Sequence, residues 1–163
     1  MTRTVKQGTA PLPDPLPASG EREKRFTHAF TAMPADIDAL GHVNNAVWVR
    51  WIQELAVAHW AAVASVEQQA AYVWVVTRHE IDYRGNVSVG ETVTGETWVP
   101  APPKGARFDR HVRFAGSDGL VKVEAVTTWA LLDRATGRLL RVRPEIAAPF
   151  LCPPTEQPRV PGA

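Results

Sequence analysis

The sequence predicts a single α+β domain in which a curled antiparallel sheet wraps around one long helix. Two patterns of apolar residues support this prediction. After Asn44, apolar or weakly polar side chains recur at the spacing of one helical face for about 20 residues. From Trp74 onward apolar residues occupy every second position, as in strands with one buried face. The segments with this pattern are separated by turns or irregular links. A lone helix is buried in such a domain only if the sheet curls around it.

The first two elements follow from residues 25–64. Between residues 25 and 32, Phe26, His28, Phe30 and Ala32 occupy alternate positions, which is typical of a half-buried strand. The helix is expected to run from about residue 45 to residue 64. Its start is well marked, because asparagine side chains accept hydrogen bonds from the free N–H groups of a first helical turn.

The remaining strands are expected after the helix, and the links between them are short or irregular. Glycine, asparagine and serine in residues 86–90 and 116–119 favour turns, and residues 100–105 form a longer link. Short links favour antiparallel neighbours. The expected strands cover residues 74–83, 91–99, 107–115 and 120–132.

Both ends of the chain are rich in proline. Residues 1–23 are expected to form an N-terminal arm and residues 151–163 a C-terminal tail, since proline interrupts helices and strand ladders. The domain itself is expected to cover residues 24–150. The arm is either a flexible appendage or a segment that lies along a partner subunit.

Composition excludes several classes of function. The chain has 163 residues, is 45% hydrophobic, and carries a formal net charge of +1. With no basic run interleaved with aromatic residues, we expect no nucleic-acid partner. Cys152 is the only cysteine, and the five histidines are scattered, so neither a disulfide nor a metal site is expected. No membrane-spanning or secretory segment is evident, which predicts a cytoplasmic protein.

The most informative segment is the loop before the helix, residues 36–45, which reads DIDALGHVNN. It brings a carboxylate at Asp38 and an imidazole at His42 close to a helix N-terminus. The free N–H groups and positive dipole end of a helix stabilise negative charge. A base, a proton partner and backbone donors in one loop are what transfer of an acyl group to water requires.

This loop and the residues after it, Trp48, Arg50, Trp51, Glu54 and Leu55, carry a resemblance to a known family. They resemble the hotdog-fold thioesterases, in particular the 4-hydroxybenzoyl-CoA thioesterase-like and acyl-ACP thioesterase branch, and the resemblance continues through residues 75–84. It covers roughly residues 24–149. It implies hydrolysis of an acyl-CoA, or of an acyl-ACP, to a free acid and a thiol without a cofactor, by a homodimer or homotetramer.

The resemblance also implies roles for three residues of the loop. Asp38 matches the catalytic carboxylate, acting either as general base or as nucleophile, and the backbone N–H of Asn45 matches an oxyanion-hole donor. His42 matches a catalytic histidine of the acyl-ACP branch. Leu40, however, stands where that branch has asparagine, which is a departure from its complete site. Asp36 and Asn44 are expected to have structural roles, as a loop-fixing aspartate and a helix cap.

Other candidates have a structural alternative. Arg107, the best of the cations at positions 104, 107, 110 and 113, is a candidate for the phosphates of CoA, although such a group is also ordinary on a charged strand edge. Trp48 is a candidate acyl contact or a core residue. Glu54 resembles the helix carboxylate that other hotdog enzymes use, but a solvated helix contact is the simpler explanation.

Two other functions remain open at this stage. One is an acyl-CoA-binding module of the same fold without turnover. The other is a hotdog enoyl hydratase or dehydratase, since those enzymes also combine aspartate with histidine.

Overall fold

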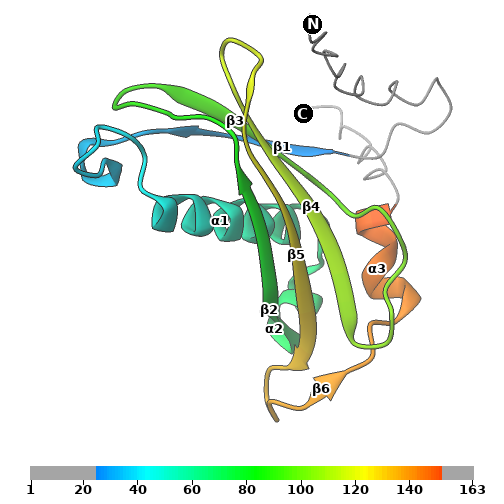
Figure 1. The fold of residues 1–163 in the computed structure, drawn as a ribbon. Helices are drawn as coiled ribbons and strands as arrows, with labels where there is room; N and C mark the ends of the chain where they lie inside the picture. The colour runs from blue at the N-terminus through cyan, green and yellow to red at the C-terminus, as the bar shows by residue number, and fades with distance from the viewer. Residues whose placement is uncertain (1–24, 152–163) are drawn as a thin grey trace, which may run out of the picture.

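The computed structural model describes residues 25–151, and the domain is an antiparallel sheet curled around one long helix, as predicted (Figure 1). The expected arm, residues 1–23, and all but the first residue of the expected tail lie outside the described residues. The elements in order are β1 (Phe26–Thr31), η1 (Pro34–Asp36), α1 (Asn45–Val63), α2 (Val66–Ala71), β2 (Tyr72–Tyr83), β3 (Thr92–Trp98), β4 (Arg107–Gly116), β5 (Val121–Asp133), β6 (Leu139–Leu140) and α3 (Pro144–Leu151).

All strand pairs are antiparallel, in the order β1-β3-β4-β5-β2, and β6 pairs with β5. The chain therefore passes from one edge strand, β1, through α1 and α2 to the other edge strand, β2. The remaining strands then fill the space between these edges as a meander. The sheet curls around α1 and is not closed (Figure 1).

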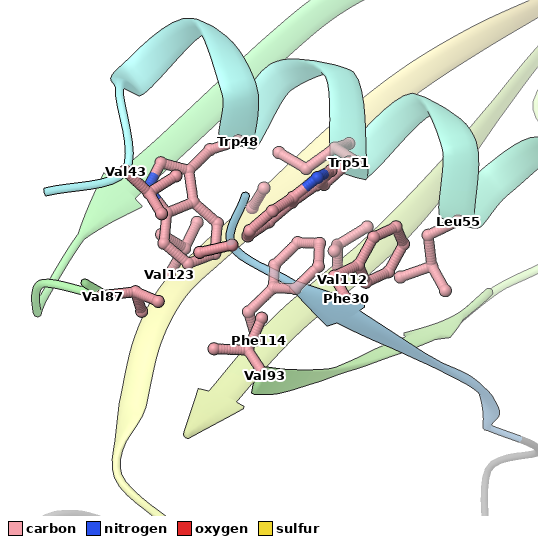
Figure 2. Packing of buried hydrophobic residues seen from close by; sticks show 13 residues of the cluster. Phe30, Val43, Trp48, Trp51, Leu55, Val87, Val93, Val112, Phe114 and Val123 are labelled. Atoms are coloured by element: carbon pink, nitrogen blue, oxygen red, sulfur yellow. The ribbon is translucent and has the colours of Figure 1, made fainter. Parts of the chain in front are cut away.

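Helix α1 begins and ends close to the predicted positions. Asn44 is its N-cap, and the Asn44 Oδ1 atom accepts a 2.9 Å hydrogen bond from the Ala46 N–H. The buried face of α1 includes Trp48, Trp51 and Leu55, which pack with aliphatic and aromatic side chains of the sheet (Figure 2). Among the sheet residues is Phe114, whose ring lies 5.4 Å from that of Trp48.

Gly95 on β3 permits the close approach of α1 to the sheet. A Cβ atom at this position would lie 2.8 Å from Cε1 of Phe114 and 3.1 Å from Cδ2 of Leu55. The first distance is shorter than real carbon contacts and the second is tight, so a larger residue would displace these side chains or the helix. Packing therefore favours glycine at this position.

Two helices were not expected from the sequence. Helix α2 begins with a capping box in which Ser65 and Gln68 exchange hydrogen bonds. Helix α3 brings Ile146, Ala147 and Phe150 into a second apolar cluster with the last turns of α1 and the ends of the sheet. Pro149 lies inside α3, and prolines of this kind conceal a short helix when only the sequence is considered.

Candidate active site

The loop that carries the thioesterase-like motif is closed by short-range pairing. Ile37 forms an antiparallel bridge with Val43, and the Asp38 N–H donates to the His42 carbonyl over 2.8 Å. Gly41, at a φ of 80°, donates its N–H to the Asp38 carbonyl. This positive φ favours glycine and allows the chain to reverse between Asp38 and His42. The loop thus places Asp38 directly opposite His42, just before α1.

One oxygen of the Asp38 carboxylate is held and the other is not. Its Oδ1 accepts hydrogen bonds from the N–H groups of Leu40, at 2.8 Å, and His42, at 3.3 Å. Within residues 25–151, Oδ2 has no hydrogen-bond partner, and the side chain is half-buried. The turn therefore fixes the orientation of the carboxylate and leaves one oxygen for another molecule.

Asp36, two residues earlier, is engaged on both oxygens. Its Oδ2 accepts from the Met33 N–H at 2.9 Å, and its Oδ1 accepts from Nη2 of Arg50 at 2.6 Å. The Met33 N–H, with the Arg50 guanidinium, holds the pKa of Asp36 below its ordinary value despite burial. The Asp36 carbonyl also accepts the Asn44 N–H at 2.9 Å. Asp36 thus anchors the loop to α1, the structural role expected for it.

The first turn of α1 leaves one backbone donor free. The Asn44 N–H donates to the Asp36 carbonyl. The Ala46 N–H donates to the Asn44 side chain, and the Val47 N–H donates to the Asn44 carbonyl. In the part of the chain that the structure describes, the N–H of Asn45 has no acceptor. The Asn45 carbonyl accepts a long bond from the Tyr83 hydroxyl, at 3.5 Å. An N–H at the positive end of a helix is suited to bind a developing oxyanion.

The other residues predicted from the sequence are not all brought to this loop. Trp48 is 2% exposed and packs in the core, so an acyl group would reach it only if the core opened. Arg107 is exposed at the start of β4. Phe114, near the other end of that strand, packs against Trp48 in the first turn of α1. Arg107 therefore lies at the end of β4 that is far from the Asp38 loop. Glu54 is exposed on α1 and forms an ion pair with Arg50 at 3.5 Å, as expected of a solvated helix residue.

A buried polar group lies farther along α1, and the contacts between its members were not predicted from the sequence. Nη1 of Arg110 lies 2.9 Å from Nδ1 of His59 and 3.0 Å from Oγ1 of Thr97. Burial, with the nearby Arg110 cation, lowers the pKa of His59 to about 3, so the imidazole is neutral. It therefore accepts the hydrogen bond from Arg110 at Nδ1 and carries its proton on Nε2.

The position of Arg110 corrects the idea that it belongs to a surface cluster with Arg107. On β4 the side chains of Phe108, Arg110, Val112 and Phe114 are buried, whereas Arg107 faces the other side of the sheet. The signal was present in the sequence, since a single charge stands among alternating apolar residues of one strand face.

None of the helices in residues 25–151 is long and apolar enough to cross a membrane. Within the same residues, no three side chains of His, Cys, Asp or Glu are grouped as a metal site.

The chain matches a known protein family over most of its length. The profile of the thioesterase-like superfamily matches residues 33–150. The sequence has no match among curated proteins.

Several solved structures are similar in fold. A candidate oleoyl thioesterase from Lactobacillus plantarum has a TM-score of 0.71 and 19% identity, over 86% of this chain and 58% of its own length. This chain therefore spans little more than half of that protein. The hypothetical protein SAV2348 from Staphylococcus aureus, in complex with CoA, has a TM-score of 0.70 and 14% identity, over 87% of this chain and 94% of its own. Slr0204, a 1,4-dihydroxy-2-naphthoyl-CoA thioesterase from Synechocystis, has a TM-score of 0.67 and 12% identity, over 78% of this chain and 96% of its own.

Proposed function

Because the chain belongs to the thioesterase-like superfamily, we propose that it hydrolyses an acyl thioester to a free acid and a thiol. The hotdog fold and the family expected from the loop motif are confirmed. Thioester hydrolysis is the activity class of this superfamily. The observation that carries the proposal is the combination of the partly free Asp38 carboxylate and the unbonded Asn45 N–H at the two ends of one closed loop.

In this proposal the Asn45 N–H binds the thioester carbonyl oxygen. Attack on the carbonyl carbon places negative charge on that oxygen, and the fixed donor at the helix start stabilises it without reorganisation. Oxyanion-hole donors of this kind contribute roughly 3–4 kcal/mol to transition-state stabilisation. The side chain of Asn45 has no part in this step, since the donor is the backbone N–H.

Asp38 acts on the other partner of the reaction. As general base, its Oδ2 takes a proton from water while the water oxygen bonds to the carbonyl carbon and the thiolate departs. As nucleophile, it bonds to the carbon itself, expels the thiolate and forms a mixed anhydride that water then cleaves to the acid. Both routes use the orientation that the Leu40 and His42 N–H groups give to the carboxylate. In this proposal His42 orients water or interacts with the charged carboxylate.

We propose that the substrate is an acyl-CoA, with an acyl-ACP as the alternative. The similar Staphylococcus aureus structure contains CoA, and the family resemblance includes both substrate types. Arg107 remains the proposed partner of the CoA phosphates. It lines an outer-face groove of about 450 Å³ together with Arg78 and Lys104. Because Arg107 and the Asp38 loop lie toward opposite ends of the sheet, one CoA would bridge them most simply across two subunits.

A homodimer or homotetramer is part of the proposal. The edge strand β2 has one side without a strand partner among the described residues, and it exposes Val75 and Tyr83. Val57 on α1 is 55% exposed. An unpaired edge with apolar side chains favours pairing with a second chain. A partner over this surface would also enclose the loop, where Asn45 is exposed and Asp38 only half-buried.

The decisive experiment measures thiol release from a panel of acyl-CoA and acyl-ACP substrates with short, long, branched and aromatic acyl groups. Purified wild type and Asp38→Asn are compared. Release by wild type that falls about a hundredfold or more in the variant supports hydrolysis with Asp38 at its centre. Tight acyl-CoA binding without release would favour the non-catalytic module, and loss of enoyl absorbance without free thiol would favour a hydratase.

A further inference from the structure

A cavity lies near the far end of α1 from the catalytic loop. It has a volume of about 190 Å³, and its wall is mostly aromatic and aliphatic, with Ala56 and Trp60 from α1, Phe150 from α3, and Trp74, Phe108 and Trp129 from the sheet. At the rise of an α-helix, Ala56 is about 16 Å along the axis from Asn45. The cavity is therefore separate from the loop that holds Asp38.

Arg110 also lines this cavity, together with Asp109 and Arg134, and its guanidinium has no counter-ion among the described residues. The residue is only 6% exposed, and no described carboxylate forms an ion pair with it. Its two side-chain hydrogen-bond partners, His59 and Thr97, are uncharged, and both contact the same nitrogen, Nη1. Its Cζ atom also lies over the ring of Phe150, 5.3 Å from the centroid, which is an uncharged contact as well. Within residues 25–151, Nε and Nη2 of Arg110 have no hydrogen-bond acceptor. A buried cation without an anion is costly in free energy, so an anionic ligand would be strongly favoured here.

A second donor at the same cavity is also unsatisfied. The indole N–H of Trp74 is buried and has no acceptor in the described part of the chain. Buried donors of native proteins are nearly always satisfied, and a donor that is not marks a place for a missing acceptor. Arg110 and Trp74 come from different strands, β4 and β2, so the two observations are independent.

We propose that this cavity binds a small apolar carboxylate, whose carboxylate group pairs with the guanidinium of Arg110 and whose hydrocarbon body fills the aromatic wall. A planar guanidinium matches a carboxylate with two parallel hydrogen bonds, and Nε and Nη2 are the two donors available for this pairing. The volume is below the roughly 300–1,000 Å³ typical of drug-sized ligands, so a single aromatic ring or a short branched chain fits best. This site does not depend on the proposed hydrolysis.

The test is a direct titration of the full-length protein with benzoate, 4-methylpentanoate and the neutral analogue benzamide. Binding is followed by calorimetry and by the fluorescence of the tryptophans that line the cavity. Wild type should bind at least one of the carboxylates saturably, and benzoate about tenfold or more tightly than benzamide, the effect of a charge-assisted bond. If neither carboxylate binds, or if benzamide binds as tightly as benzoate, the proposal is wrong.

Three variants locate the site. Arg110→Met should remove the preference for benzoate, and Ala56→Leu should fill the cavity and abolish binding while leaving Arg110 in place. Arg84→Gln removes an exposed cation next to β2 that pairs with Glu124, and it should bind as wild type does. If Arg110→Met does not fold, as judged by circular dichroism, Ala56→Leu still decides. Unchanged benzoate binding in a folded Ala56→Leu variant would contradict the proposal.

Discussion

Nη1 of Arg110 on β4 and Nδ1 of His59 on α1 lie 2.9 Å apart in the core, although the two residues are 51 positions apart in the chain. The imidazole can accept this bond only while it is neutral. The contact therefore joins the helix to the sheet through a group that must lose the bond when it is protonated.

The first prediction concerns the dependence of stability on pH. His59 has a pKa of about 3 when folded, against 6.5 as its ordinary value, so between these pH values the unfolded chain binds the extra proton. The neutral His59 side chain makes its full contribution to the free energy of unfolding above about pH 6.5. This contribution is lost as the pH falls, by about 1.4 kcal/mol per pH unit at most. Urea unfolding of wild type and His59→Asn at pH 7, 6 and 5 measures it. The variant should show the smaller loss on acidification, and equal losses would contradict the lowered pKa of His59.

The second prediction separates the two aspartates of the loop. Asp36→Asn should lower the free energy of unfolding by about 1–3 kcal/mol, because the buried carboxylate loses its ion pair with Arg50. Its thiol release, measured below its melting temperature, should stay close to that of wild type. Asp38→Asn should show the reverse, with near-normal stability and a loss of turnover of about a hundredfold or more. Equal turnover losses in both variants would mean that the loop, rather than one carboxylate, is responsible.

The local pattern of the sequence was sufficient for helix α1, strands β1 to β5 and the cap at Asn44, because each depends on neighbours within a few residues. Strand β6 was not predicted. The order of the strands was not predictable in this way, since it depends on pairings such as Phe26 with Thr97. The contact between His59 and Arg110 is equally long-range. Helix α3 was missed because Pro149 lies within it, although Ile146 and Phe150 have the spacing of one helical face.

In the candidate site, too, the features that depend on neighbouring residues were predicted from the sequence, and those that depend on long-range contacts were not. The motif located Asp38 and the N–H of Asn45 in one loop, because loop and cap chemistry are local. Trp48 could be a core residue or a ligand contact by sequence alone, and only its packing against Phe114 distinguishes the two. Arg110 could have been separated from Arg107 by strand alternation, but its missing counter-ion depends on every residue around it.

The third prediction concerns the packing of α1 on β3. Gly95→Ala should reduce the free energy of unfolding by about 1–3 kcal/mol, because the new methyl group would overlap the ring of Phe114. Thr94→Ala, at the adjacent exposed position of the strand, is the matched control and should change stability much less. Chemical denaturation of both variants makes the comparison. Equal stabilities of the two variants would show that the helix can move away from the sheet at little cost.

The fourth prediction isolates the backbone N–H of Asn45, which side-chain truncation cannot remove. Proline is well accepted at the first position of a helix, and Asn44, with a ψ of 143°, already has the extended conformation required before proline. Asn45→Pro should therefore fold normally, while it lacks this donor as well as the Asn45 side chain.

Asn45→Ala is the matched control for that variant, because it loses the same side chain and keeps the N–H. Thiol release by Asn45→Pro should fall by about a hundredfold to a thousandfold, as for other lost oxyanion-hole donors, and Asn45→Ala should lose little. Circular dichroism and melting temperatures confirm that both variants are folded. If the two variants release thiol at similar rates, the donor is not at the reacting oxygen, and an N–H elsewhere, including one from a second subunit, must stabilise it.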